Sequence, residues 1–173
     1  MDARQQEHDI DVQITNSFDG PDMCLSKLKK LVRVVCARFG LSKVTVSIAI
    51  VGDEQIRKSN KQFLGRDFST DCLSFDLSDD QVPPARKKAG RTGTENPGTG
   101  PSKLFELVVN AEKAVREASL RGHSAQAELA LYIVHGLLHN LGFDDSTPEK
   151  AKKMHSAEDE ILNQLGFGII YNS

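Results

Sequence analysis

The sequence has no long hydrophobic stretch and few cysteines. Its longest uninterrupted apolar run, Leu129 to Val134, has six residues, whereas a membrane span needs roughly 18. The first twelve residues carry four acidic side chains and no apolar segment, so we expect neither a secretory signal nor a transit peptide. The three cysteines form no CxxC pair, which is typical of reduced thiols in the cytoplasm. We therefore expect a cytoplasmic protein that does not bind membranes.

The chain also lacks an excess of charge of either sign. Its 22 lysines and arginines against 24 aspartates and glutamates give a net charge of −2. That balance excludes a globally basic nucleic-acid binder but is compatible with a local basic patch. The hydrophobic content of 39% and the charged content of 27% are typical of a globular protein. At this length we expect one domain, residues 1–173, that buries roughly 70% of the surface of its unfolded chain.

Hydrophobic periodicity predicts four strands and five helices, with most of the strands first. The strands are expected at 10–14, 44–51, 70–77 and 104–110. The helices are expected at 25–39, 54–64, 111–121, 125–141 and 148–165, with Asp22, Asp53, Ser124 and Thr147 as candidate N-caps. Three consecutive helices after the last strand favour an α+β fold, in which one sheet of about four strands packs against helices.

A segment of different composition, residues 79–103, separates the third strand from the fourth. It contains four glycines and four prolines in 25 positions and only three apolar residues. Such a composition cannot build a core, so a long mobile loop is expected. Its five basic side chains leave a dedicated RNA-contacting arm as the less favoured alternative.

Two histidines interrupt a helix that is apolar on nearly every side, AQAELALYIVHGLLHNL. His135 and His139 are four residues apart, so they project from one face on successive turns and can hold a single ion. From the spacing alone, hydrogen-bonded core histidines remain an equal alternative. The surrounding apolar residues predict that this helix is buried in the core.

The residues after the second histidine favour a metal site. Gly142 can take a positive φ, end the helix and fold the chain back, which would bring Asp145 to the two imidazoles as a third ligand. The resulting pattern is HxxxHxxGxxD. Two imidazoles and one carboxylate leave one tetrahedral position open, as in catalytic zinc sites, although nickel or cobalt would also be accepted. Asp144 is expected to orient a histidine or to cap the helix end.

Two other zinc chemistries are disfavoured. Zinc peptidases with an HExxH helix use the glutamate beside the first histidine as general base, and here that position is Gly136. A structural zinc site would need a fourth protein ligand, and none is evident in the sequence.

A second candidate element precedes the third strand. Arg66 follows a glycine in a short predicted loop, and its guanidinium offers two parallel donors to a phosphate. A surface ion pair is the alternative role for this arginine. Asp71, also before the strand, is expected to be a turn residue or to support the site indirectly.

Three motifs, in order along the chain, are TDCLSFDL, EASxxGHSxxxE and HGLLHNLGFDD. Together they resemble the YbeY family of bacterial endoribonucleases, from about Asp11 to Phe167. The resemblance implies a zincin-like α+β fold and one Zn²⁺ per chain. It also implies cleavage of single-stranded RNA in 16S rRNA 3′-end maturation and ribosome quality control, with rRNA precursors and the small ribosomal subunit or its proteins as partners.

The resemblance assigns zinc binding to His135 and His139, and substrate binding or catalysis to Arg66. Asp145 stands where the family usually has a third histidine, and its added negative charge should make the zinc a weaker Lewis acid. The chain also departs from the family in its longer 79–103 loop and in Phe105, where the family usually carries glycine.

The expected chemistry is metal-assisted phosphodiester hydrolysis, with Arg66 steadying the charge that develops on the phosphate. Basic residues of the first two helices are candidates for holding RNA: Lys27, Lys29, Lys30, Arg33, Arg57, Lys58 and Lys61. The competing hypothesis is a non-catalytic ribosome-assembly factor that binds RNA and tolerates a weakened metal site. RNA cleavage that a chelator abolishes discriminates the enzyme from the binding factor.

Overall fold

The computed structural model describes residues 9–78 and 102–168. Most of the predicted 79–103 loop therefore lies outside the described residues, and its last residue, Lys103, begins a strand. The strands are β1 (Asp9–Asn16), β2 (Lys43–Val51), β3 (Cys72–Asp76) and β4 (Lys103–Asn110). The helices are α1 (Leu25–Arg38), α2 (Asp53–Leu64), α3 (Ala111–Arg121), α4 (Ala125–Asn140) and α5 (Pro148–Gln164).

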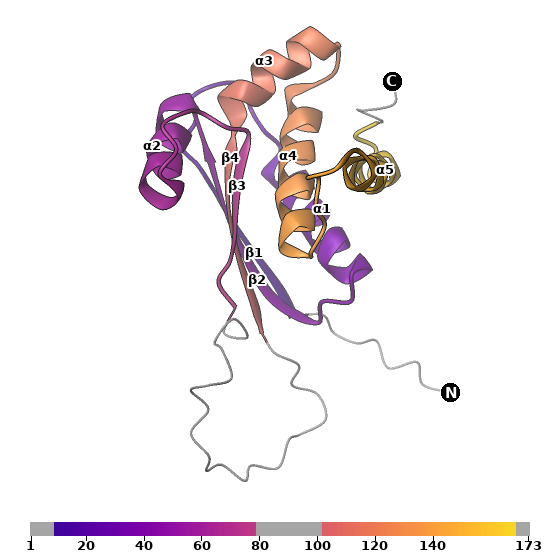
Figure 1. Ribbon diagram of the computed structural model, residues 1–173. Helices are drawn as coiled ribbons and strands as arrows, with labels where there is room; N and C mark the ends of the chain where they lie inside the picture. The colour runs from indigo at the N-terminus through magenta and orange to yellow at the C-terminus, as the bar shows by residue number, and fades with distance from the viewer. Residues whose placement is uncertain (1–8, 79–101, 169–173) are drawn as a thin grey trace, which may run out of the picture.

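The four strands form one mixed sheet in the order β1-β2-β4-β3. β1 pairs parallel with β2 and β2 parallel with β4, whereas β3 runs antiparallel to β4 at the edge. Helices α1, α4 and α5 lie on one side of the sheet and α2 lies on the other (Figure 1). The prediction of an α+β fold with a four-stranded mixed sheet is confirmed.

Helix α4 is the central element of the helical layer, as its apolar sequence predicts. Eleven of its 16 residues are buried. A Cβ added to Gly136 would lie 2.7 Å from Cys72 Sγ of β3 and 2.9 Å from Leu107 Cδ2 of β4. Glycine at this position therefore allows the helix to approach the sheet closely, and it leaves no room for the glutamate of an HExxH helix.

Two of the four predicted N-caps are confirmed and two are wrong. The side chains of Ser124 and Thr147 each accept a hydrogen bond from the backbone N–H three residues later. Helix α1 begins after Cys24 rather than Asp22, without a side-chain cap. The carboxylate of Asp53 does not cap α2 but accepts hydrogen bonds from distant side chains, which a local pattern cannot reveal.

The third strand is shorter than the predicted 70–77. Asp71 Oδ1 accepts a hydrogen bond from the backbone N–H of Cys72 at 2.7 Å, which holds the chain in a turn until the strand begins.

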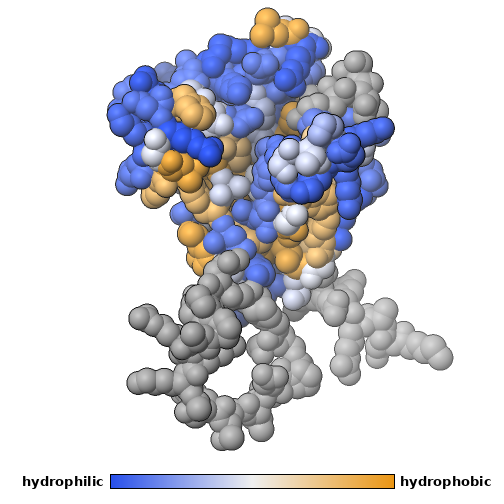
Figure 2. Space-filling model, viewed as in Figure 1, coloured by the Kyte–Doolittle hydropathy of each residue, from blue (hydrophilic) through white to orange (hydrophobic). Residues whose placement is uncertain are grey.

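The described surface is largely hydrophilic, with apolar patches near α2 and the sheet (Figure 2). Within the described residues, no helix is long and apolar enough to cross a membrane.

Candidate metal centre

Three potential ligands converge at the C-terminal half of α4. One ligand atom from each of His135, His139 and Asp145 lies within 4.8 Å of the other two. The two imidazole Nε2 atoms are 3.1 Å apart, and Asp145 Oδ2 lies 3.8 Å from each of them. The structure thus brings together the three residues that the sequence pattern selected.

The loop after α4 positions Asp145. Gly142 has φ +90°, and the backbone N–H of Phe143 donates to the Leu138 carbonyl at 2.9 Å. Phe143 also packs edge-on against Phe39, with ring centroids 5.7 Å apart. The chain therefore reverses directly after the helix, and the carboxylate three residues beyond Gly142 faces the imidazoles.

Asp144 has a different role from its neighbour. Its carboxylate accepts hydrogen bonds from Ser146 N at 2.9 Å, Ser146 Oγ at 2.7 Å and Lys150 Nζ at 2.7 Å. Lys150 and Ser146 hold the pKa of Asp144 well below its usual value. Among the described residues, no hydrogen bond joins it to either histidine, so it stabilises the loop that leads into α5.

Both imidazoles are oriented through their other ring nitrogen. His135 Nδ1 lies 2.8 Å from Glu158 Oε1, and His139 Nδ1 lies 3.2 Å from the Phe143 carbonyl oxygen. Both partners are acceptors and favour a proton on each Nδ1, the tautomer in which each Nε2 has a lone pair for a metal ion. Although burial disfavours protonation of His135, the hydrogen bond and charge of Glu158 raise its pKa above the ordinary value.

The arrangement concentrates electron-rich atoms, which a bound cation would balance. Tetrahedral zinc with bonds of about 2.0–2.1 Å to nitrogen places two imidazole nitrogens about 3.3 Å apart. The observed Nε2 separation of 3.1 Å is close to that value. The side chains of His135 and His139 are 21% and 32% exposed, so an ion has access from solvent. The nitrogen, nitrogen and oxygen donors therefore fit one divalent metal ion.

Glu158 contacts a candidate metal ligand, and the sequence analysis did not identify it. It lies on α5 and is fully buried. Its signal in the sequence is an acidic residue within the apolar stripe of α5 that includes Met154, Ile161 and Leu162. A carboxylate at such a position needs a polar partner in the core, and His135 is that partner.

The structure places Arg66 and Asp71 in the segment between α2 and β3. Arg66 is exposed, and the surface ion pairs of its loop are made by Asp67 with Arg57 and Lys61 instead. Among the described residues, no hydrogen bond or ion pair joins the Arg66 guanidinium to the centre. Asp71 accepts hydrogen bonds from its own turn and borders a cavity together with His135.

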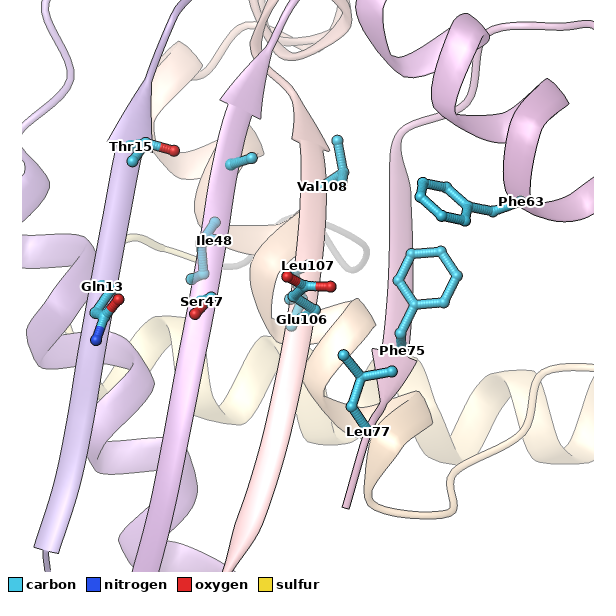
Figure 3. Close-up of a pocket in the computed structure, with 11 residues that line it drawn as sticks. Gln13, Thr15, Ser47, Ile48, Phe63, Phe75, Leu77, Glu106, Leu107 and Val108 are labelled. Atoms are coloured by element: carbon cyan, nitrogen blue, oxygen red, sulfur yellow. The ribbon is translucent and has the colours of Figure 1, made fainter. Parts of the chain in front are cut away.

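One cavity borders the metal centre, a second follows the loop after α4, and a third lies elsewhere. One of about 290 Å³ includes His135, and one of about 410 Å³ lies along the loop from Leu141 to Asp144. The third, of about 610 Å³, opens on the side of the sheet away from the helical layer (Figure 3). It is lined by the rings of Phe63 and Phe75 among others, and none of the three candidate metal ligands lines it.

Comparisons with known proteins find one family. The model of the family described as Endoribonuclease YbeY matches residues 11–166. An Endoribonuclease YbeY of Bacillus licheniformis is 36% identical over 148 residues, which cover 84% of this chain and 88% of the relative. One of Halalkalibacterium halodurans is 32% identical over 165 residues, covering 91% and 98%. The solution structure of a Thermotoga maritima protein shares the fold, with a TM-score of 0.55 and 21% identity over 88% of this chain and 90% of that one.

Proposed function

Because the chain belongs to the YbeY family of endoribonucleases, we propose that it is a zinc-dependent enzyme that cleaves single-stranded ribosomal RNA precursors. The endoribonuclease activity and the RNA substrate follow from the family. Our proposal adds the metal, the residues that hold it and the place of action. That place is the 3′ end of 16S rRNA, in maturation and ribosome quality control, with the small ribosomal subunit or its proteins as partners in the cytoplasm.

The observation that carries the proposal is the convergence of His135 Nε2, His139 Nε2 and Asp145 Oδ2. Three donors of this kind leave one tetrahedral position for water or substrate, which distinguishes a catalytic zinc site from a closed structural one. A zinc ion bound there supplies Lewis acidity, which activates water and polarises a phosphoryl oxygen.

The chain's own residues prepare the site. Glu158 and the Phe143 carbonyl hold the two imidazoles with their Nε2 atoms directed inward, so that ligand geometry is set before a metal binds. Asp145 contributes a negative charge at the solvent-exposed side. We assign substrate binding to Arg66. Among the described residues its guanidinium forms no ion pair, so its two parallel N–H donors are available to a phosphate.

The test is cleavage of RNA by the purified chain. An unstructured oligoribonucleotide and a duplex of the same sequence are incubated with the protein, with a chelator, and with zinc restored after chelation. We expect cleavage of the unstructured strand only, its loss with chelator and its return with zinc. Cleavage that persists in the chelator would contradict the metal mechanism. RNA binding without cleavage by the zinc-loaded protein would instead support a non-catalytic assembly factor.

A further inference from the structure

The cavity beside His135 has a charged lining in which most groups already have partners. It lies between α3 and α4, and its basic residues are Lys113 and Arg121. Arg121 lies 3.5 Å from both Glu117 and Glu128, which are two of the three carboxylates in the lining. Arg121 is therefore committed to these acidic neighbours.

The third carboxylate, Asp71, is also engaged, because its Oδ1 accepts hydrogen bonds from Cys72 N and Thr70 Oγ1. Lys113 differs from the other charged groups of this cavity. Its backbone N–H bonds to Asn110, but among the described residues its ammonium makes no hydrogen bond and no ion pair. Lys113 is thus the charged donor that remains available in a cavity that borders a candidate metal ligand.

The second cavity lies at the C-terminal end of α4 and also contains lysines, although none of the three candidate ligands lines it. Leu141 to Asp144 line one side, and Lys150 and Lys153 of α5 line the other. Lys150 is paired with Asp144 at 2.7 Å. Lys153 is exposed and, within the part of the chain that the structure describes, its side chain has no hydrogen-bond or ion-pair partner.

Along the chain, the two histidines of the metal centre lie between residues that line the two cavities. Tyr132 lines the first and Leu141 the second. These residues are about 14 Å apart along the direction of the helix, a distance that a few nucleotides of an unpaired strand can span. Figure 1 shows α3 at the start of α4 and the loop to α5 at its end. Lys113 belongs to α3 and Lys153 to α5.

We propose that Lys113 and Lys153 bind phosphates of one RNA strand on the two sides of the metal centre. This inference rests on the proposed RNA-cleaving function and assigns the path of the substrate. It replaces part of the basic set expected from the sequence, since Arg57 and Lys61 are paired with Asp67, and Lys58 is paired with Glu54. The available cations beside the site come from α3 and α5 instead.

The experiment measures RNA binding apart from cleavage. The affinity of the full chain for a labelled oligouridylate is followed over a series of potassium chloride concentrations, with a chelator present so that the RNA stays intact. The variants are Lys113→Gln, Lys153→Gln and their combination. Lys43→Gln is the matched control, because Lys43 is an exposed lysine at the start of β2 that lines neither cavity. Thermal melting confirms that each variant is folded.

We expect the slope of log affinity against log salt to fall by about 0.7 for each single variant and by about 1.4 for the double variant, as for the loss of one and two phosphate contacts to a single strand. The Lys43→Gln slope should equal that of the wild type. If the wild type binds RNA but all the slopes agree, the proposed path is overturned and the enzyme function stands. If the wild type neither binds nor cleaves RNA, the proposed function itself fails.

Discussion

The carboxylate of Glu158 lies 2.8 Å from Nδ1 of His135, within the core between α4 and α5. This contact links a fully buried acidic residue to a candidate metal ligand 23 positions earlier in the chain. It fixes the orientation of the imidazole and makes its Nε2 a better donor. We therefore expect the metal centre to depend on a residue outside its three candidate ligands.

Replacement of Glu158 by glutamine should weaken metal binding. Glutamine keeps the shape of the side chain but removes the charge that holds the imidazole, and we expect zinc affinity to fall about 10- to 100-fold. Competition with a chromophoric chelator measures the affinity. Glu160→Gln is the control, since Glu160 forms a surface ion pair with Arg38 and should leave zinc affinity unchanged. Equal affinities for the two variants would remove Glu158 from the site.

Gly136 should tolerate no larger side chain without loss of stability. In Gly136→Ala the new methyl group meets Cys72 Sγ and Leu107 Cδ2, both within 3.0 Å. Overpacking of this kind costs about 1–3 kcal/mol, which exceeds the gain of about 1 kcal/mol in helix propensity. We expect a net loss of about 1 kcal/mol in urea unfolding.

Gly136→Ala in a Cys72→Ala background tests whether packing against the sulfur causes the loss of stability. Removal of the sulfur provides space for the methyl group, so the double-mutant cycle should show a favourable coupling of about 1 kcal/mol. Strictly additive effects would show that the α4–β3 contact does not limit the size of residue 136.

Asp53 should make stability depend on pH in the acid range. The hydrogen bonds that Arg116 donates lower the pKa of Asp53 to about 2, and Asn110 and Ser69 contribute in the same direction. A depressed pKa stabilises the folded chain fully above the unfolded pKa of about 4, and this stabilisation is lost as the pH falls toward 2. The stability difference between wild type and Asp53→Asn should therefore shrink between pH 4 and pH 2. A constant difference would contradict the assigned ion pair.

Arg66→Ala should abolish RNA cleavage while zinc remains bound. Among the described residues, Arg66 makes no hydrogen bond or ion pair with the three candidate ligands, so its loss should not change the metal centre. Arg57→Ala is a suitable control, because Arg57 is a neighbouring cation that is paired with Asp67 at 2.7 Å. Cleavage by Arg66→Ala at the rate of the control would exclude Arg66 from substrate binding and catalysis.

Local sequence patterns predicted the elements that local chemistry determines. The β-branched run of β2, the apolar sequence of α4 and the caps Ser124 and Thr147 depend on neighbouring residues, and all are present in the structure. The turn at Gly142 also follows from local backbone freedom. For the same reason, the approach of Asp145 to the histidines could be predicted from spacing within 11 residues of the chain.

Contacts between distant segments could not be predicted in this way. Asp53 has the sequence of a helix cap, but Arg116 and Asn110 lie beside it only after α3 and β4 have assembled with α2. The apolar stripe of α5 indicates that Glu158 is buried, but its partner His135 is determined only when α5 packs on α4. The sequence likewise does not show that Arg121 pairs with Glu117 and Glu128, which leaves the ammonium of Lys113 available to a phosphate.

The metal content of the wild type, Asp145→Ala and Asp144→Ala tests the central claim most directly. The two aspartates are adjacent in sequence, but only Asp145 faces the imidazoles, whereas Asp144 bonds to Ser146 and Lys150. Mass spectrometry of the three proteins, purified without chelator, should find about one zinc ion per chain in the wild type and in Asp144→Ala, and a large loss in Asp145→Ala. Full zinc occupancy in Asp145→Ala, or a wild type without metal, would contradict a centre built from His135, His139 and Asp145.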